Sequence, residues 1–144
     1  MPLIKKITLL SIIFIVGFFI KANAEEIKKI GKFKDWEAMV VTDTTGKVCF
    51  AQSKPILQAP KSNKREAKLF IAFRPFEKII NEVSVTAGYE FNKNNSITAT
   101  SGKNKFKFDI KEQGFAWIAD TKIEFRMIKR MKKGSRIMIT GYNQ

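Results

Sequence analysis

The single cysteine, Cys49, is the most reactive side chain in this sequence, whose 144 residues contain no histidine. A thiolate nucleophile needs a base or a nearby positive charge, and the neighbours that supply one are Lys47 and Lys54. Without histidine the chain forms no Ser-His-Asp triad and no imidazole metal site. A thiol-dependent enzyme centred on Cys49 is one alternative. The flanking residues Val48 and Phe50 favour a structural half-cystine or a buried thiol instead.

Pairs of carboxylates are the second arrangement that does chemistry, because two carboxyl groups about 5 to 10 Å apart suit glycoside cleavage. The candidate pairs are Glu82 with Glu90 and Asp109 with Glu112. Thirteen acidic residues in a chain of this length produce such pairs by chance. We therefore assign no catalytic, cofactor-binding or metal-binding residue, and the sequence predicts a protein that is not an enzyme and holds no cofactor.

Basic side chains supply the remaining candidate site, since 27 lysines and arginines against 13 acidic residues give a net charge of +14. Such a field favours anionic partners. In residues 105–111, apolar Phe106 and Phe108 alternate with charged residues, so we expect a row of lysines on the solvent face of a strand. The candidate anion-binding residues are Lys105, Lys107 and Lys111 in that row and Lys129, Arg130, Lys132 and Lys133, followed by Arg136, near the end of a predicted helix.

The chemistry of this basic surface indicates a class of partner. A row of positive charge attracts polyanions such as lipopolysaccharide phosphate or acidic glycans with salt-sensitive affinity. Only 5 of the 27 basic residues are arginine, the residue suited to bidentate recognition, so no specific nucleic acid is predicted. The alternative is that the lysines only solvate the surface and discourage pairing at sheet edges.

The first 24 residues have the organisation of a signal peptide. Lys5 and Lys6 precede an apolar run of 14 residues from position 7 to position 20, and an Ala-Asn-Ala cleavage pattern ends at Ala24. The run is shorter than the roughly 20 residues that cross a bilayer as a helix. An uncleaved anchor is the competing interpretation. We expect a single mature domain of residues 25–144 that is periplasmic, or exported to the outer membrane or beyond, and does not span the membrane.

The mature segment has the pattern of a mainly β domain with one short helix in its C-terminal half. A hairpin within residues 31–55 turns at positions 43–46, and further strands are predicted at 68–74, 83–91, 96–100, 105–111, 114–118 and 135–142. The three strands at 83–91, 96–100 and 105–111 are expected in meander order, residues 25–29 are expected to be loose, and residues 58–68 are expected to form an exposed loop.

Helical spacing of apolar residues predicts the helix over residues 121–133, with Asp120 as N-cap and Gly134 as the stop. The sequence therefore predicts an antiparallel β-sandwich or barrel-like domain of seven or so strands with this one helix.

Several motifs together resemble the invasion-associated locus B family of exported alphaproteobacterial proteins. They are FKDW at 33–36, GKVCFAQSKP at 46–55, FIAFRP at 70–75, NEVSVTAGYEF at 81–91, GFAWI at 114–118 and MKKGSRIMITG at 131–141. The resemblance covers nearly all of the mature segment, and none of these motifs is catalytic.

The resemblance implies an exported β-rich cell-envelope protein that acts through contacts with the host or the envelope. Many family members continue past the position of Tyr142 to a second cysteine. A fragment or a naturally shortened member would leave Cys49 without that partner. An unpaired thiol in an oxidising compartment suggests an intermolecular bridge, so a Cys49-linked homodimer is a further expectation.

Overall fold

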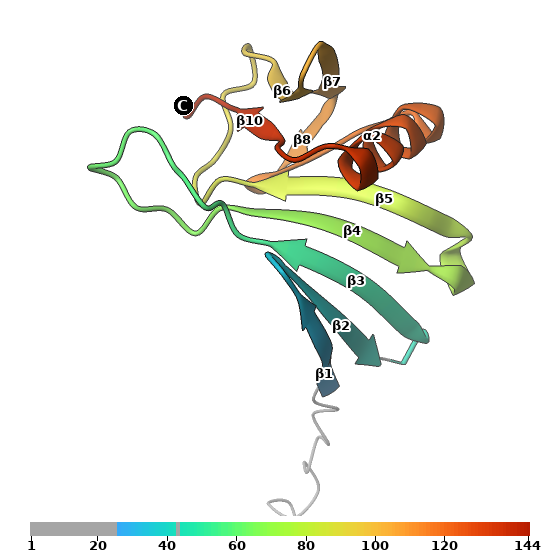
Figure 1. Ribbon diagram of the computed structural model, residues 1–144. Coiled ribbons are helices and arrows are strands. Elements are labelled where there is room, and N and C mark those ends of the chain that lie inside the picture. The colour runs from blue at the N-terminus through green and yellow to red at the C-terminus, as the bar shows by residue number, and fades with distance from the viewer. Residues whose placement is uncertain (1–25, 43) are drawn as a thin grey trace, which may run out of the picture.

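The computed structural model describes residues 26–42 and 44–144, and it shows a mainly β architecture with two antiparallel sheets and one α-helix (Figure 1). The predicted signal peptide lies outside the described residues. The elements in chain order are β1 (Glu26–Phe33), β2 (Trp36–Thr42), β3 (Lys47–Ser53), β4 (Lys68–Arg74), a 3-10 turn (Pro75–Glu77), β5 (Ile79–Thr86), β6 (Ile97–Ser101), β7 (Asn104–Phe108), β8 (Ile110–Glu112), β9 (Phe115–Trp117), α2 (Thr121–Lys133) and β10 (Met138–Thr140).

Seven strands form the larger sheet in the order β1-β2-β3-β4-β5-β9-β8. β1 to β5 follow one another as an antiparallel meander, and the predicted hairpin is β2–β3, with Trp36 opposite Ser53 and Val40 opposite Cys49. The remaining strands pair in the order β10-β6-β7. No closed barrel forms among residues 26–42 and 44–144, so the barrel-like alternative is wrong and the two-sheet alternative holds.

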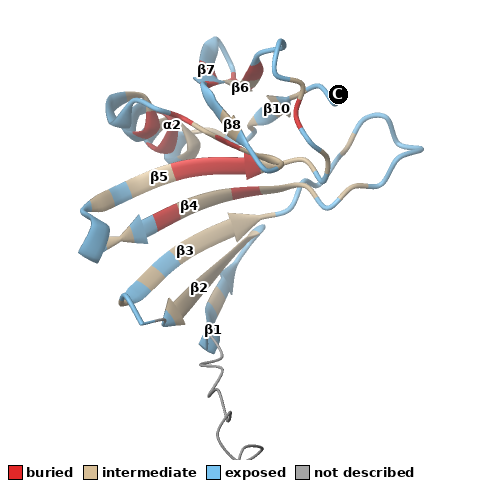
Figure 2. Ribbon diagram, turned by 180° about the vertical axis from the view of Figure 1, so that it is seen from behind, coloured by how far each residue is buried: buried red, intermediate tan, exposed pale blue. Residues whose placement is uncertain are grey.

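The smaller sheet and α2 together form a second layer over the β5 side of the larger sheet (Figure 1). The core lies between these layers. Its largest fully buried side chains come from both: Val83 on β5, Ile97 and Phe108 on the smaller sheet, and Met127 on α2. Figure 2 shows the same concentration, with buried residues on β5, the smaller sheet and α2.

The helix forms where the sequence predicts it. The side chain of Asp120 accepts a hydrogen bond from the backbone N–H of Lys122, so it satisfies one of the free donors of the first turn. Met127 and Ile128 are buried, and Ile123 and Met131 pack against the core. The helix ends at Gly134, whose N–H donates to the carbonyl of Arg130 at 2.8 Å.

Three strand predictions are wrong in their extent. Residues 26–29, expected to be loose, belong to β1 because they pair with residues 39–42 of β2. β5 begins at Ile79 and ends at Thr86, so the predicted alternation through Phe91 stops early. The predicted C-terminal strand is reduced to β10.

The expected meander of the three strands at 83–91, 96–100 and 105–111 is half right, because β6 and β7 pair as predicted but β5 does not pair with β6. β5 pairs with β4 and β9, whereas β6 pairs with β7 and β10 in the other sheet. The predicted strand 105–111 is interrupted at Asp109, whose N–H donates to the carbonyl of Trp117 at 2.9 Å. Its two halves therefore lie in different sheets, as β7 and β8.

An aromatic row occupies the face of the larger sheet that is turned away from the core. The rings of Phe50, Phe70, Phe115 and Trp117 follow one another across β3, β4 and β9 with centroids 5.7 to 6.2 Å apart. All four side chains are half-buried. Trp117 thus lies on the outer face of the larger sheet, whereas Trp36 packs against the core.

Candidate functional site

A set of nine basic residues comes together on the second layer, and we call it the basic cluster. It consists of Lys103, Lys105, Lys107, Arg126, Lys129, Arg130, Lys132, Lys133 and Arg136. The two segments that supply them, residues 97–108 and 125–144, contain no aspartate or glutamate side chain. Eight of the nine residues are exposed and Arg130 is half-buried. The acidic residues that adjoin these segments are Glu124 of α2, which is buried, and Asp109, which follows β7 and pairs with Lys107, so the exposed charge of the second layer is mainly positive.

Rigid elements hold this cluster in place. Residues 105–108 of β7 alternate between the two faces of the strand. Phe106 and Phe108 are buried, whereas Lys105 and Lys107 are exposed, so the strand directs both lysines to solvent. Arg126 of α2 lies over the ring of Phe106, with its guanidinium carbon 6.0 Å from the ring centroid. This contact joins the basic side of the helix to the basic strand.

Two hydrogen bonds fix the chain just after the helix. The Ser101 hydroxyl donates to the carbonyl of Arg136 at 2.9 Å, and the N–H of Gly134 donates to the carbonyl of Arg130 at 2.8 Å. They bring the β6–β7 turn against the segment that leads into β10. Only Lys107 in the cluster forms an ion pair within the described part of the chain, with Asp109 at 3.7 Å.

A hollow of about 410 Å³ lies between the β6–β7 turn and the end of α2. Arg130 and Arg136 line it together with Ser101, Gly102 and Ser135. Gly102 has a φ of +58°, and a Cβ at this position would lie 2.9 Å from Nη2 of Arg130. The guanidinium therefore rests directly against the glycine turn.

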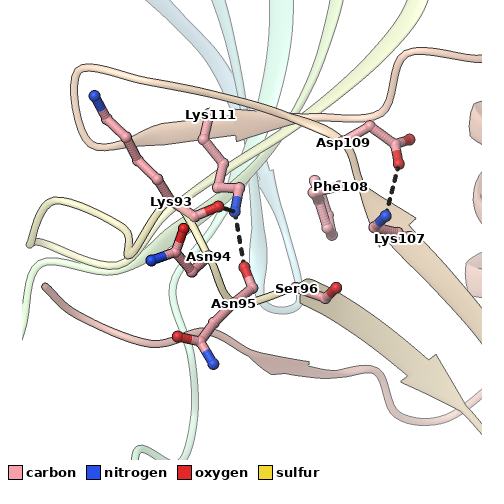
Figure 3. A pocket seen from close by; sticks show the side chains of 8 residues that line it. All are labelled: Lys93, Asn94, Asn95, Ser96, Lys107, Phe108, Asp109 and Lys111. Atoms are coloured by element: carbon pink, nitrogen blue, oxygen red, sulfur yellow. Dashed lines mark hydrogen bonds and ion pairs between the residues drawn. The ribbon is translucent and has the colours of Figure 1, made fainter.

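Lys111 does not belong to the predicted row, because it lies on β8 in the larger sheet. Its ammonium donates to the carbonyls of Asn92 at 3.1 Å, Lys93 at 2.8 Å and Asn95 at 2.7 Å. Figure 3 shows the side chain directed into the turn that precedes β6. All three donors of the ammonium are used within the protein, so Lys111 stabilises a turn and is not a free cation.

A smaller hollow of about 230 Å³ beside this turn is lined by Lys93, Lys107, Asp109 and Lys111 (Figure 3). Two of its three cations are already engaged, since Lys107 pairs with Asp109 and Lys111 is bound by the turn. It therefore has less uncompensated positive charge to attract an anion than the hollow at the end of α2.

Cys49 is exposed on β3, opposite Val40 of β2 and Phe73 of β4. The prediction of a buried thiol is therefore wrong. Its side chain has no hydrogen bond or ion pair within residues 26–42 and 44–144, so the structure gives it no activating group. Exposure leaves the Cys49-linked homodimer as a prediction.

The candidate carboxylate pairs serve the structure. Glu82 forms an ion pair with Arg74 at 2.7 Å, and Glu90 accepts a hydrogen bond from the N–H of Gly114 at 2.9 Å. Asp109 pairs with Lys107. No group of three or more cysteine, aspartate and glutamate residues suited to a metal ion occurs in the described part of the chain.

Among the residues that the structure describes, Glu124 is the one buried carboxyl, at 5% exposure, and it ties α2 to the larger sheet. Its Oε1 accepts a hydrogen bond from the N–H of Val83 at 2.8 Å. Burial raises the pKa of Glu124, and the bond from Val83 only partly opposes that rise, to which the charges of Glu82 and Asp120 add. This carboxyl has its polar partner in the backbone, so it acts in packing rather than in a site.

Sequence reasoning found the arginine and lysines at the helix end but missed the partners that complete the hollow. Ser101 and Gly102 lie more than 30 residues before Ser135 in the sequence, and the two places meet only through the pairing of β6 with β10. The turn at Gly102 and the stop at Gly134 were the only local signs of this place.

Comparison with known proteins adds no relative: no family model, no curated protein and no solved structure matches this chain. Among the residues that the structure describes, no helix has the length and apolar character needed to cross a bilayer.

Proposed function

We propose that this chain is an exported, non-enzymatic protein of the cell envelope that binds anionic polymers through the basic cluster. The ligand class is a phosphate-bearing or carboxylate-bearing polymer, such as lipopolysaccharide or an acidic glycan. The observation that supports the proposal is the charge of the second layer, where nine basic residues stand in two segments without a single acidic one.

The distribution of charge matters more than its total. The two segments contain 32 of the 144 residues and carry +9 of the net charge of +14, while all 13 acidic residues lie elsewhere. Like charges held close together repel one another, and this repulsion is relieved when an anion approaches. A polymer with regularly spaced charges can neutralise several of these cations at once.

The competing explanation is that the lysines only keep the surface soluble. Such lysines would be expected to alternate with acidic residues, as in the rest of the chain, where Lys29 pairs with Glu37 and Arg74 with Glu82. In the basic cluster only Lys107 has an acidic partner, Asp109, within the described part of the chain. The cations of the cluster also stand on a packed helix and a packed strand, which reduces the entropy lost when they bind.

Export, a contact role at the envelope or host surface, and the likeness to invasion-associated locus B proteins enter this proposal as expectations from the sequence. They agree with a surface that works by charge and needs no reacting group. The Cys49-linked homodimer would place two such surfaces in one molecule and strengthen binding to a long polymer.

The test is the salt dependence of binding to fluorescently labelled long-chain polyphosphate, measured by anisotropy with the purified protein. We expect affinity to fall at least about tenfold between about 0.05 M and 0.5 M sodium chloride, because bound cations on the polymer are released when the protein binds. No binding at the lower salt concentration, or an affinity that does not change with salt, would overturn the proposal.

A further inference from the structure

We propose that the hollow between the β6–β7 turn and the end of α2 is a specific site for one phosphate group of the ligand, held by Arg130 and Arg136. This inference rests on the proposed function, which it deepens by naming the subsite and the group that it recognises. The remaining lysines of the basic cluster then supply only long-range attraction.

The lining of the hollow has the donors that a phosphate group requires. Arg130 and Arg136, on either side of Ser135 in the sequence, both line it, and no acidic residue does. A guanidinium presents its N–H groups in a planar fork that matches the oxygens of phosphate, which an ammonium does not. Only 5 arginines occur in the whole chain, and two of them line this hollow.

Arg130 is held in place but not satisfied. Its Nη2 rests against the turn at Gly102, and its Nε is buried without a hydrogen-bond partner in the described part of the chain. A buried N–H of a charged group that lacks an acceptor costs free energy. A phosphate oxygen in the hollow would supply an acceptor for this guanidinium.

The backbone on the other side is fixed as well. The hydrogen bond from Ser101 to the carbonyl of Arg136 holds the segment after the helix, and the Ser135 hydroxyl is exposed beside it. The volume of about 410 Å³ lies in the range of roughly 300 to 1,000 Å³ that is usual for ligand sites. It therefore accommodates a phosphate together with part of the group that carries it.

One feature of the hollow opposes anion binding. The carbonyl groups at the end of α2 carry partial negative charge, which repels a phosphate and favours nearby cations. Arg130, Lys132 and Lys133 lie in the last turn of the helix, where they counter that charge. Arg136 stands beyond the helix and is in excess of this need, so the hollow keeps positive charge for a ligand.

The experiment is an NMR titration of the purified, isotopically labelled protein with inorganic phosphate at constant ionic strength. We expect saturable shifts confined to the amides around Gly102 and Ser135, with no such shifts from chloride at equal ionic strength. Arg130→Gln and Arg136→Gln should each weaken phosphate binding about tenfold, because each removes a charged, bidentate donor. Arg136→Lys keeps the charge and should restore only part of the affinity.

Lys122→Gln is the matched control, since it removes one positive charge from the other end of the same helix, outside both the hollow and the basic cluster. It should change phosphate affinity less than about twofold. Shifts spread evenly over the basic cluster, or equal losses in Lys122→Gln and Arg136→Gln, would overturn the specific site. Binding of polyphosphate without a saturable response to phosphate would overturn this site alone, whereas loss of both would overturn the proposed function too.

A second arm separates the sources of the phosphate. Vesicles of phosphatidylcholine with about a fifth phosphatidic acid present phosphate groups on a surface, and inorganic phosphate presents them free. Retention on these vesicles that depends on Arg136 would identify a lipid headgroup as an accessible source. A response to free phosphate without such retention would also support the site and would assign it to a soluble or polymer-borne group.

Discussion

The second layer and the outer strands β1–β3 belong to one domain but differ in both packing and charge. The second layer contributes fully buried side chains such as Phe108 and Met127, whereas no residue of β1–β3 is buried. The outer strands mix charges and form the pair between Lys29 and Glu37 at 2.6 Å, whereas the two segments of the second layer carry no acidic side chain. The second layer thus combines fully buried side chains with exposed cations, of which only Lys107 has an ion-pair partner in the described part of the chain.

This difference has a physical consequence. Cations on long side chains lose less freedom on binding when the elements beneath them are already fixed. The outer strands instead hold their sheet together by backbone pairing and by half-buried residues such as Phe50. The predictions below test whether stability and binding are divided between the two regions in this way.

The largest expected difference concerns the loss of an aromatic ring. Phe108→Ala removes a side chain that is 0% exposed between the two layers, and it should lower the free energy of unfolding by about 3–5 kcal/mol. Phe50→Ala in β3 removes a half-buried ring and should cost about 1–2 kcal/mol. Urea denaturation of the two variants measures both values. Equal losses would show that the outer strands are as firmly packed as the second layer.

A smaller effect is expected at the turn that leads into the second layer. Lys111→Met keeps the aliphatic stem but removes three bonds to backbone carbonyls, so it should cost about 1–3 kcal/mol. Lys107→Met is the control, because its exposed ion pair at 3.7 Å should contribute less than about 1 kcal/mol. Thermal denaturation of the two variants compares them directly. If Lys111→Met costs no more than Lys107→Met, the ammonium does not hold the turn.

The smallest expected effect is the pH dependence that Glu124 adds where α2 packs on β5. Because burial raises the pKa of this carboxyl in the folded state, its contribution to stability is fully present below the ordinary glutamate pKa of 4.5 and is lost as pH rises through the raised value. The wild type should therefore gain stability relative to Glu124→Gln as the pH falls from 8 to 4. Denaturant titrations of both proteins across this pH range give the difference.

Glu90→Gln is the matched control for that series, since Glu90 also accepts a backbone hydrogen bond but is exposed. The relative gain should be larger for the Glu124 pair of proteins than for the Glu90 pair. A gain of the opposite sign at Glu124 would contradict the burial argument.

Local signals in the sequence were sufficient for the helix and the first hairpin. Asp120, the apolar spacing and Gly134 define α2 within a single stretch of chain, and the turn before Lys47 defines β2–β3. The division of residues 105–111 between two sheets was not predictable, because alternation at a period of two is the same whichever strand becomes the partner. The bond from Asp109 to Trp117 decides it, and that contact depends on the whole fold.

The candidate site was predictable only where its residues are close together in the sequence. The basic residues of the helix end are visible as a cluster in sequence, so Arg130 could be named before the structure. Its association with Gly102 and Ser101 depends on the pairing of β6 with β10. The prediction for Lys111 was wrong. Alternation of charged and apolar residues placed it in one row with Lys105 and Lys107, but the strand is interrupted at Asp109 and Lys111 lies on β8 in the larger sheet.

The most direct test of the central claim compares two triple variants that change the net charge equally. Lys103→Glu, Lys105→Glu and Lys129→Glu reverse exposed cations of the basic cluster, and Lys28→Glu, Lys32→Glu and Lys47→Glu reverse exposed cations of β1–β3. Affinity for long-chain polyphosphate is measured for both at about 0.1 M salt. We predict that the first variant loses at least about tenfold more affinity than the second. Equal losses would mean that total charge alone attracts the polymer, and they would contradict a binding surface on the second layer.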